Sequence, residues 1–150
     1  MQTKAALEKS GPGIGVQVSS IDLQGPDDVE RALSEVMRRR ADAMIVPMTP
    51  TLLAARGRII GFASKHRLPT AYAEQVFTYD GGLMSYGYSV SDKYRDAAAV
   101  IAKILRGTKP GEIPVDYSMR FKLVVNLKTA KALGLRIPQS VLIQADEVIR

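Results

Sequence analysis

The sequence predicts an α/β fold, an open and mostly parallel sheet sandwiched by helices. Apolar segments of strand length alternate along the chain with segments whose apolar residues recur at helical spacing. Glycine or proline separates most of these segments. The chain has 150 residues, 46% of them hydrophobic, which is enough apolar material for one compact core. Strands that alternate with helices favour right-handed crossovers and therefore a parallel sheet.

The first half of the chain holds the clearest elements. Val29 and Leu33 belong to a helical apolar pattern that begins at Asp27 and Glu30, which have the spacing of a capping box. Thr51 is a candidate cap for a later helix. The elements expected here are a helix over residues 2–9, a strand over 14–23, a helix over 27–40, a strand over 43–46 and a helix over 51–66.

The second half continues the alternation and then changes. Ser89 and Asp92 again have the spacing of a capping box, and Gly107 ends the helix that they begin. Pro110 and Pro114 indicate a linker. The elements expected are a strand over 68–73, an irregular piece over 74–80, a strand over 83–86, a helix over 89–106, a strand over 121–126 and helical segments over 127–133 and 141–148.

The formal net charge of +6 raises the possibility of nucleic-acid binding, but the distribution of the charges does not favour it. The densest basic cluster, Arg38 to Arg40, ends a predicted helix, where cations interact favourably with the helix dipole. The other basic residues are scattered along helices without interleaved aromatic residues. We therefore expect no nucleic-acid partner.

Catalytic and cofactor sites are not predicted either. His66 is the only histidine and ends a predicted helix, where a surface position is expected. No histidine and carboxylate cluster has metal-ligand spacing, and the chain has no cysteine. The glycine-rich segment 11–15 precedes a strand, whereas a phosphate-binding loop follows one. The sequence thus predicts a protein that is not an enzyme and has neither cofactor nor metal.

A ligand site is expected at the carboxyl ends of the parallel strands, where loops and helix N-termini lie. Three loops qualify, at residues 47–51, 73–77 and 87–91. Their threonines either cap helices or bind a ligand carboxylate, and Glu74 either pairs with a ligand ammonium or is solvated. Tyr86 and Tyr88 either pack in the core or offer flat faces to an apolar side chain of the ligand. The candidate ligand-binding residues are Thr49, Thr51, Glu74, Gln75, Ser85, Tyr86 and Tyr88.

Three segments carry a resemblance to a known family. They are GGLMSYG, the Tyr-Arg-Asp-Ala-Ala helix that ends in ILRGTKPGEIPV, and FKLVVNLKTAKALGLRIPQSVLIQADEVIR. The sequence resembles the C-terminal half of ABC-transporter substrate-binding proteins of the tryptophan/tyrosine-binding type, strongly over residues 68–150 and more loosely before them. The resemblance implies a type I periplasmic-binding fold, in which two α/β lobes close on a small ligand.

The resemblance also implies an organisation and partners. Residues 1–86 are expected to form the second lobe, and residues 87–150 a crossover and a segment that would complete a missing first lobe. The expected partners are an amino-acid-like ligand of the aromatic or branched class and an ABC permease. The parent protein is expected to be periplasmic or extracytoplasmic, although MQTKAALEKSG has no signal peptide of its own. Apolar faces in the C-terminal segment predict a homodimer or a repacked tail.

Two alternatives stay open at this stage. One is a small α/β enzyme, which turnover assays on an intact two-lobed version would reveal. The other is an effector-sensing domain of a transcription regulator, which can use the same architecture. An upstream helix-turn-helix segment would support that function, whereas an upstream signal peptide would support transport.

Overall fold

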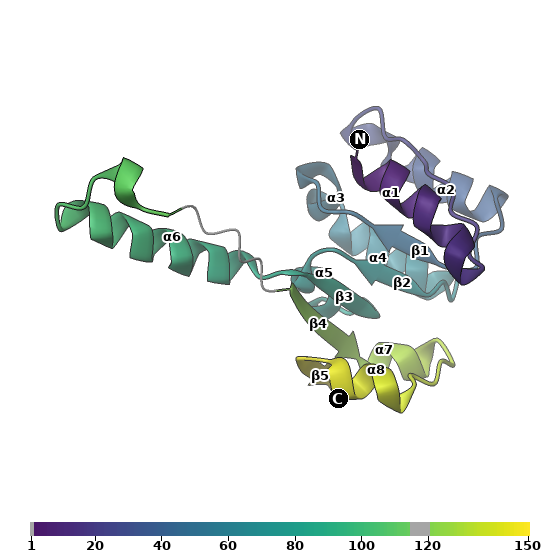
Figure 1. The fold of residues 1–150 in the computed structure, drawn as a ribbon. Coiled ribbons are helices and arrows are strands. Elements are labelled where there is room, and N and C mark those ends of the chain that lie inside the picture. Colours follow the sequence, from purple (N-terminus) through teal and green to yellow (C-terminus); the bar gives the residue numbers. More distant parts are fainter. Residues whose placement is uncertain (1, 115–120) are drawn as a thin grey trace. The chain divides into compact units, whose positions relative to one another are not determined.

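A computed structural model describes residues 2–114 and 121–150 (Figure 1). By the density of their contacts they form two compact units, one ending at Ala41 and one beginning at Asp42. Within the first unit, α1 (Gln2–Ser10) is followed by a 3-10 turn (Gly11–Ile14), a second 3-10 turn (Pro26–Asp28) and α2 (Val29–Arg38).

The strand predicted over residues 14–23 is wrong. Residues 16–24 have no regular secondary structure, and the side chains of Ile14 and Val16 are 78% and 50% exposed. Alternating apolar residues stabilise a strand only where another strand pairs with its backbone and one face is buried. Neither condition holds for Ile14 and Val16.

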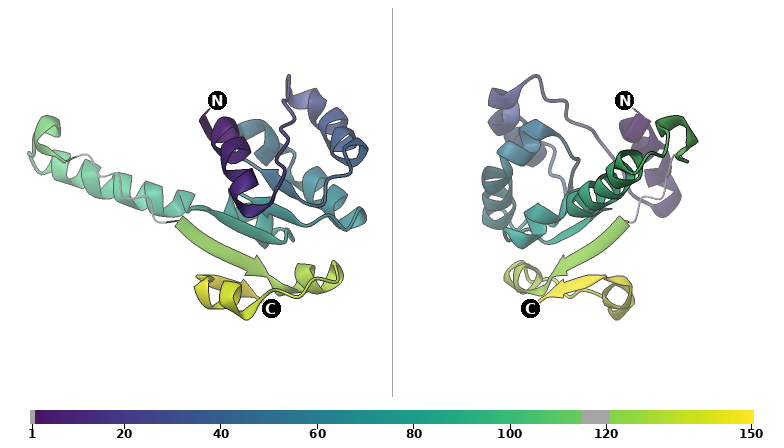
Figure 2. Two further views of the ribbon diagram at one scale, coloured as in Figure 1. Left: turned by 45° about the vertical axis from the view of Figure 1, so that its right-hand side comes forward. Right: turned by 90° about the vertical axis from the view of Figure 1, so that its left-hand side faces the viewer.

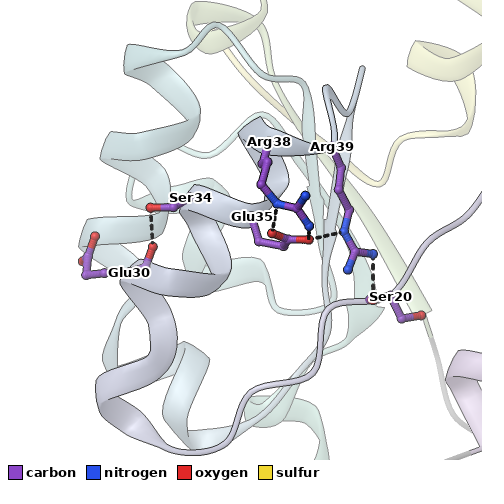
Figure 3. A network of polar contacts seen from close by, with 6 residues as sticks. All are labelled: Ser20, Glu30, Ser34, Glu35, Arg38 and Arg39. Carbon is purple, nitrogen blue, oxygen red and sulfur yellow. Dashed lines mark hydrogen bonds and ion pairs between the residues drawn. The ribbon is translucent and has the colours of Figure 1, made fainter.

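The predicted helix over residues 27–40 is present as α2, and it buries Val29, Leu33 and Val36. At its end, the guanidinium groups of Arg38 and Arg39 both donate to the carboxylate of Glu35, with N to O distances of 2.6 Å (Figure 3). These bonds hold the pKa of Glu35 down at about 2. Two arginines of the densest basic cluster thus have an intramolecular partner.

The second unit is built on a five-stranded sheet in the order β1-β2-β3-β4-β5. The strands β1, β2 and β3 are parallel, β4 is antiparallel to β3, and β5 is parallel to β4. The predicted open, mostly parallel α/β sheet is therefore confirmed. The strands are β1 (Met44–Val46), β2 (Thr70–Tyr72), β3 (Met84–Tyr88), β4 (Phe121–Asn126) and β5 (Glu147–Ile149).

Three sequence-based assignments in this unit need correction. The single helix predicted over 51–66 is two helices divided at Ala55. Residues 74–80, predicted irregular, contain a helix, and the helix predicted over 141–148 is a helix followed by β5. Residues 147–149 form a strand because their backbone pairs with β4, and such long-range pairing overrides a local helical pattern. The helices are α3 (Pro50–Ala54), α4 (Arg56–Lys65), α5 (Gln75–Tyr79), α6 (Val90–Leu105), α7 (Leu127–Ala132) and α8 (Gln139–Gln144), with a 3-10 turn at Pro110–Glu112.

One face of the sheet carries the core of this unit. Tyr72 is buried there and stacks on Phe77 of α5, with ring centroids 4.7 Å apart. Ile60 of α4 and Thr129 of α7 line the same small cavity as Tyr72, so these helices lie on the same face. The opposite face exposes alternate residues, among them Ile45 and Tyr86.

The C-terminal strands continue the sheet beyond β3, whereas α6 leaves it at the end of β3 (Figure 2). Ser85 of β3 pairs with Val124 of β4, so residues 121–149 share one sheet with residues 44–88. The predicted boundary between residues 86 and 87 falls inside β3. The division into a second lobe and a first-lobe segment stays a prediction. Among the described residues, α6 is the element of the predicted first-lobe segment that leaves the sheet.

Candidate functional site

The carboxyl ends of β1, β2 and β3 meet at one edge of the sheet. Val46, the last residue of β1, pairs with Tyr72, the last residue of β2, and Tyr72 pairs with Ser85. Beyond the ladder, the amide of Ala73 donates to the carbonyl of Val46 over 3.0 Å. This edge is the expected place for a ligand in an open α/β sheet, because the loops there are not used to cover the core.

Gly87 allows two of these loops to approach each other closely. A Cβ atom at position 87 would lie 1.9 Å from the carbonyl oxygen of Ala73, which no real side chain permits. The loop after β2 therefore crosses directly over the end of β3. The structure therefore gives a steric reason for glycine at position 87.

The loop after β1 places its two threonines differently from the expectation. Thr49, rather than Thr51, caps the helix: its Oγ1 accepts from the amide of Leu52 over 3.2 Å. The reason is backbone geometry, since Thr49 is extended, as an N-cap residue must be, and Thr51 already lies inside α3. A hydroxyl that accepts one bond still has a hydrogen atom to donate, so capping leaves Thr49 able to bind a ligand oxygen.

The loop after β2 brings a carboxylate to the edge. Glu74 is the N-cap residue of α5, its side chain makes no capping hydrogen bond, and it is 8% exposed. Burial raises the pKa of Glu74, and the nearby Lys93 ammonium offsets part of that rise. Gln75 follows as the first residue of α5, and its Nε2 is buried with no hydrogen-bond partner among the described residues.

The three predicted residues of β3 fall on two faces. Ser85 is fully buried on the face that also carries Tyr72 and α5, and its Oγ has no hydrogen-bond partner among the described residues. Tyr86 points to the opposite face and is 62% exposed, because successive side chains of a strand alternate. Tyr88 is half-buried on the same side as Tyr86. The structure therefore separates Ser85 from the two tyrosines.

Two further residues belong to this neighbourhood and were not predicted. The Lys93 ammonium lies 3.5 Å from the ring centroid of Tyr88, which is a cation–π contact, and it also acts on Glu74. Phe121 stacks on Tyr86 with centroids 5.4 Å apart and meets Tyr88 edge-on at 6.4 Å. The position of Lys93 in the first turn after a strand could have indicated that it lies near the site. Phe121 is 35 residues from Tyr86, so its contact with Tyr86 can be predicted only from the register of β3 and β4.

The start of α6 is held by polar contacts. The Oγ of Ser89 accepts from the amide of Asp92 over 3.3 Å, as the capping pattern predicts. The carboxylate of Asp92 pairs with Arg95 and with Lys122 of β4, the latter at 2.8 Å. These cations hold the pKa of Asp92 at about 2. The first turn of α6 is thereby tied to β4 at the edge where Glu74 lies.

The described residues offer little enclosed volume for a ligand. The cavity lined by Ile60, Tyr72 and Thr129 measures about 10 Å³, which is room for about one water molecule and not for an amino acid. No group of three metal-ligating side chains occurs in the described part of the chain. Within residues 2–114 and 121–150, no helix is long and apolar enough to cross a membrane.

Comparison with known proteins gives a family for this fold. The model of the ABC transporter substrate-binding protein family matches residues 2–149. The chain belongs to this family. No curated protein matches the sequence.

Three solved structures place the family fold on these residues. A conserved domain protein from Vibrio cholerae matches with a TM-score of 0.84 and 24% identity over 98% of this chain and 49% of its own. An ABC domain from Streptococcus pneumoniae in complex with L-Trp matches with a TM-score of 0.83 and 26% identity over 98% and 50%. A substrate-binding protein with adhesive properties from Clostridium difficile, ligand-free and open, matches with a TM-score of 0.66 and 21% identity over 97% and 48%.

The substrate-binding family therefore accounts for the whole described fold, and the chain spans about half the length of the three structures. The predicted resemblance and fold class are confirmed. The family is one of transport proteins and not a class of enzymes. Roles of the individual candidate residues stay predictions.

Proposed function

We propose that this chain supplies one wall of the solute cleft of an ABC-transporter substrate-binding protein and that the solute is a small amino acid. The observation that carries the proposal is the buried carboxylate of Glu74 at the carboxyl edge of β1, β2 and β3. The family match supports transport rather than effector sensing. Binding and closure are the whole mechanism, because the permease recognises the closed form and no bond is made or broken.

The chemistry of this edge suits an amino acid. Glu74 can pair with the ammonium of an amino acid ligand. The hydroxyl of Thr49 and the ammonium of Lys93 can bind the carboxylate of the same ligand. Gln75 Nε2 is a buried donor without a protein partner, and such a group costs about 1–3 kcal/mol until water or a ligand satisfies it. The L-Trp held by the pneumococcal structure favours the aromatic class.

The two predicted tyrosines, Tyr86 and Tyr88, fit this site less well. Tyr86 and Phe121 stack on the face opposite Ser85, so a ligand beside Glu74 does not meet both faces of β3. We keep Thr49, Glu74 and Gln75 as the central candidates, with Ser85 buried behind them. Thr51, Tyr86 and Tyr88 are candidates for the margin of the site.

The test is a titration of the ¹⁵N-labelled chain with L-tryptophan, followed by NMR, because chemical shifts report even millimolar binding to one wall of a cleft. Shifts at Thr49, Glu74 and Gln75 are expected. Glu74→Gln removes the charge and should weaken binding about tenfold, the loss of one charge-assisted hydrogen bond. Glu112→Gln, at an exposed carboxylate, is the matched control and should bind as the wild type does.

The proposal fails if neither L-tryptophan nor any other aromatic or branched L-amino acid shifts these residues. It also fails if Glu74→Gln and Glu112→Gln bind equally well. In either case the edge of the sheet is not the ligand site.

The remaining parts of the function follow from the family. We infer that the intact protein works outside the cytoplasm and delivers its solute to an ABC permease. The exposed apolar residues of α6 support association of this chain with a second copy.

A further inference from the structure

The turn that ends α5 is held by side chains from β4, α7 and β5, the elements that continue the sheet beyond β3. Residues 78–81 receive hydrogen bonds from two residues of the C-terminal segment. Asn126 Nδ2 donates to the carbonyl of Thr78 over 3.2 Å, and Thr129 Oγ1 donates to the carbonyl of Gly81 over 2.8 Å. Tyr79, in the same turn, donates to the carboxylate of Glu147 over 2.8 Å.

Asn126 has the central position in this group. Its side chain is 5% exposed and uses both ends of its amide: Nδ2 donates to Thr78, and Oδ1 accepts from the amide of Thr129, which caps α7. Its own backbone amide donates to the carbonyl of Leu83 over 2.9 Å. One buried residue thus joins the end of α5, the residue before β3 and the start of α7.

A helix as short as α5 depends on such bonds. It has five residues, well below the length at which a helix is stable by itself. The carbonyl of Thr78, in its last turn, accepts from the backbone amide of Gly81 over 3.2 Å, and Asn126 adds a second, side-chain bond to the same oxygen. Glu74 and Gln75 lie about one helical turn before Thr78, so a displacement at the end of α5 is close enough to reach them.

We propose that Asn126 is a positioning residue that fixes the orientation of α5 and thereby the place of the Glu74 carboxylate at the edge of the sheet. It acts from β4, on the far side of β3 from the loop that holds Glu74. The role of Asn126 in orienting α5 is inferred from these contacts alone, whereas its effect on ligand affinity rests on the proposed function. The experiment therefore reads the two separately.

The variant that tests the proposal is Asn126→Asp, which has nearly the same size and keeps the acceptor for Thr129. Above the pKa of the introduced carboxyl, an oxygen without a proton faces the carbonyl of Thr78, and two acceptors repel. When the carboxyl is protonated, it can donate to Thr78 again. We expect the amides of residues 75–82 to exchange hydrogen about tenfold faster than in the wild type at pH 8, consistent with the loss of one buried hydrogen bond. The difference should shrink as the pH falls towards 5.

The side-chain carboxyl of Glu74, followed by ¹³C NMR, gives a readout without ligand. In Asn126→Leu, which adds no titrating group, loosening of α5 should return the pKa of Glu74 towards its ordinary value. Thr70→Val is the matched control, because it removes a buried hydroxyl bond to the carbonyl of Leu68 and lies at the start of β2, outside α5. It should lower the melting temperature and leave Glu74 and the α5 amides unchanged.

Thr129→Val keeps the proposal testable if the Asn126 variants do not fold, because Thr129 is only partly buried. It should move Glu74 in the same direction by a smaller amount. The proposal is overturned if these variants lose stability as Thr70→Val does while Glu74 and residues 75–82 behave as in the wild type. L-tryptophan titration is the last arm: failure of the wild type to bind contradicts the proposed function, and the Glu74 titration still decides the role of Asn126.

Discussion

Single residues decide whether the loops at the carboxyl edge of the sheet can come together. The carbonyl of Ala73 occupies the space that a side chain at Gly87 would need. Glu74 then follows at once, and its carboxylate is buried at the point where the loop turns into α5. A site that depends on two adjacent residues of one loop is sensitive to small displacements of that loop.

Gly87→Ala should destabilise the protein by about 2–4 kcal/mol, because the added methyl group forces the Ala73 loop away from β3. Gly57→Ala is the control: no atom lies within 4 Å of its added Cβ, and alanine within a helix is favoured by about 1 kcal/mol. Urea unfolding measures both free energies. Equal stabilities of the two variants would contradict the close approach.

Glu74→Gln should change the pH dependence of stability. Burial raises the pKa of Glu74 in the folded state, against the opposing effect of Lys93, so the folded protein holds this proton more tightly than the unfolded chain. The resulting stabilisation is fully present below the unfolded pKa and is lost as the pH rises through the folded one. Relative to the wild type, Glu74→Gln should gain stability between pH 4 and pH 8, measured by urea unfolding at each pH. A constant difference would contradict the prediction.

At the scale of elements, α6 differs from the other helices of its unit. Its residues from 93 to 105 are exposed except for Ala102, which is half-buried. A helix with so little burial relies on local interactions, and Ser89 provides the cap at its start.

Ser89→Ala should therefore loosen the first turns of α6. The loss of an N-cap costs about 1 kcal/mol, which corresponds to roughly fivefold faster amide exchange in α6. Ser89→Thr, which keeps the acceptor, should restore most of the protection, and Ser64→Ala, in the middle of an exposed surface of α4, should leave α6 unchanged. If the alanine and threonine variants exchange alike, capping does not control α6.

At the scale of the whole molecule, the exposed apolar residues of α6 bear on association. Tyr94 is 74% exposed, Ile101 55% and Leu105 82%. Apolar surface of this kind on one helix favours burial against another surface. The predicted homodimer would use it.

Leu105→Lys places a charge in this surface and should shift the chain towards monomer without loss of folded stability, since Leu105 is mostly solvated already. Sedimentation equilibrium at several concentrations measures the shift. The matched variant Leu135→Lys alters a less exposed leucine outside α6 and should leave association unchanged. A wild-type chain that stays monomeric at the highest concentration would contradict the dimer.

The sequence by itself determined the fold class, the positions of most helices and strands, and the cap at Ser89. It could do so because helical spacing, short apolar runs and capping residues are local patterns that the backbone obeys directly. It also placed the candidate loops at the carboxyl ends of β1, β2 and β3, since the carboxyl edge of a parallel sheet follows from strand order alone.

Only the tertiary structure decided the remaining points. It left residues 16–24 out of the sheet, made residues 147–149 a strand and separated Ser85 from Tyr86. It also brought Asn126 to the end of α5, 48 residues away in sequence. The two strand assignments depend on which backbone segments pair across long distances in sequence, and the energy of such pairing belongs to two segments at once, so neither segment's own pattern contains it.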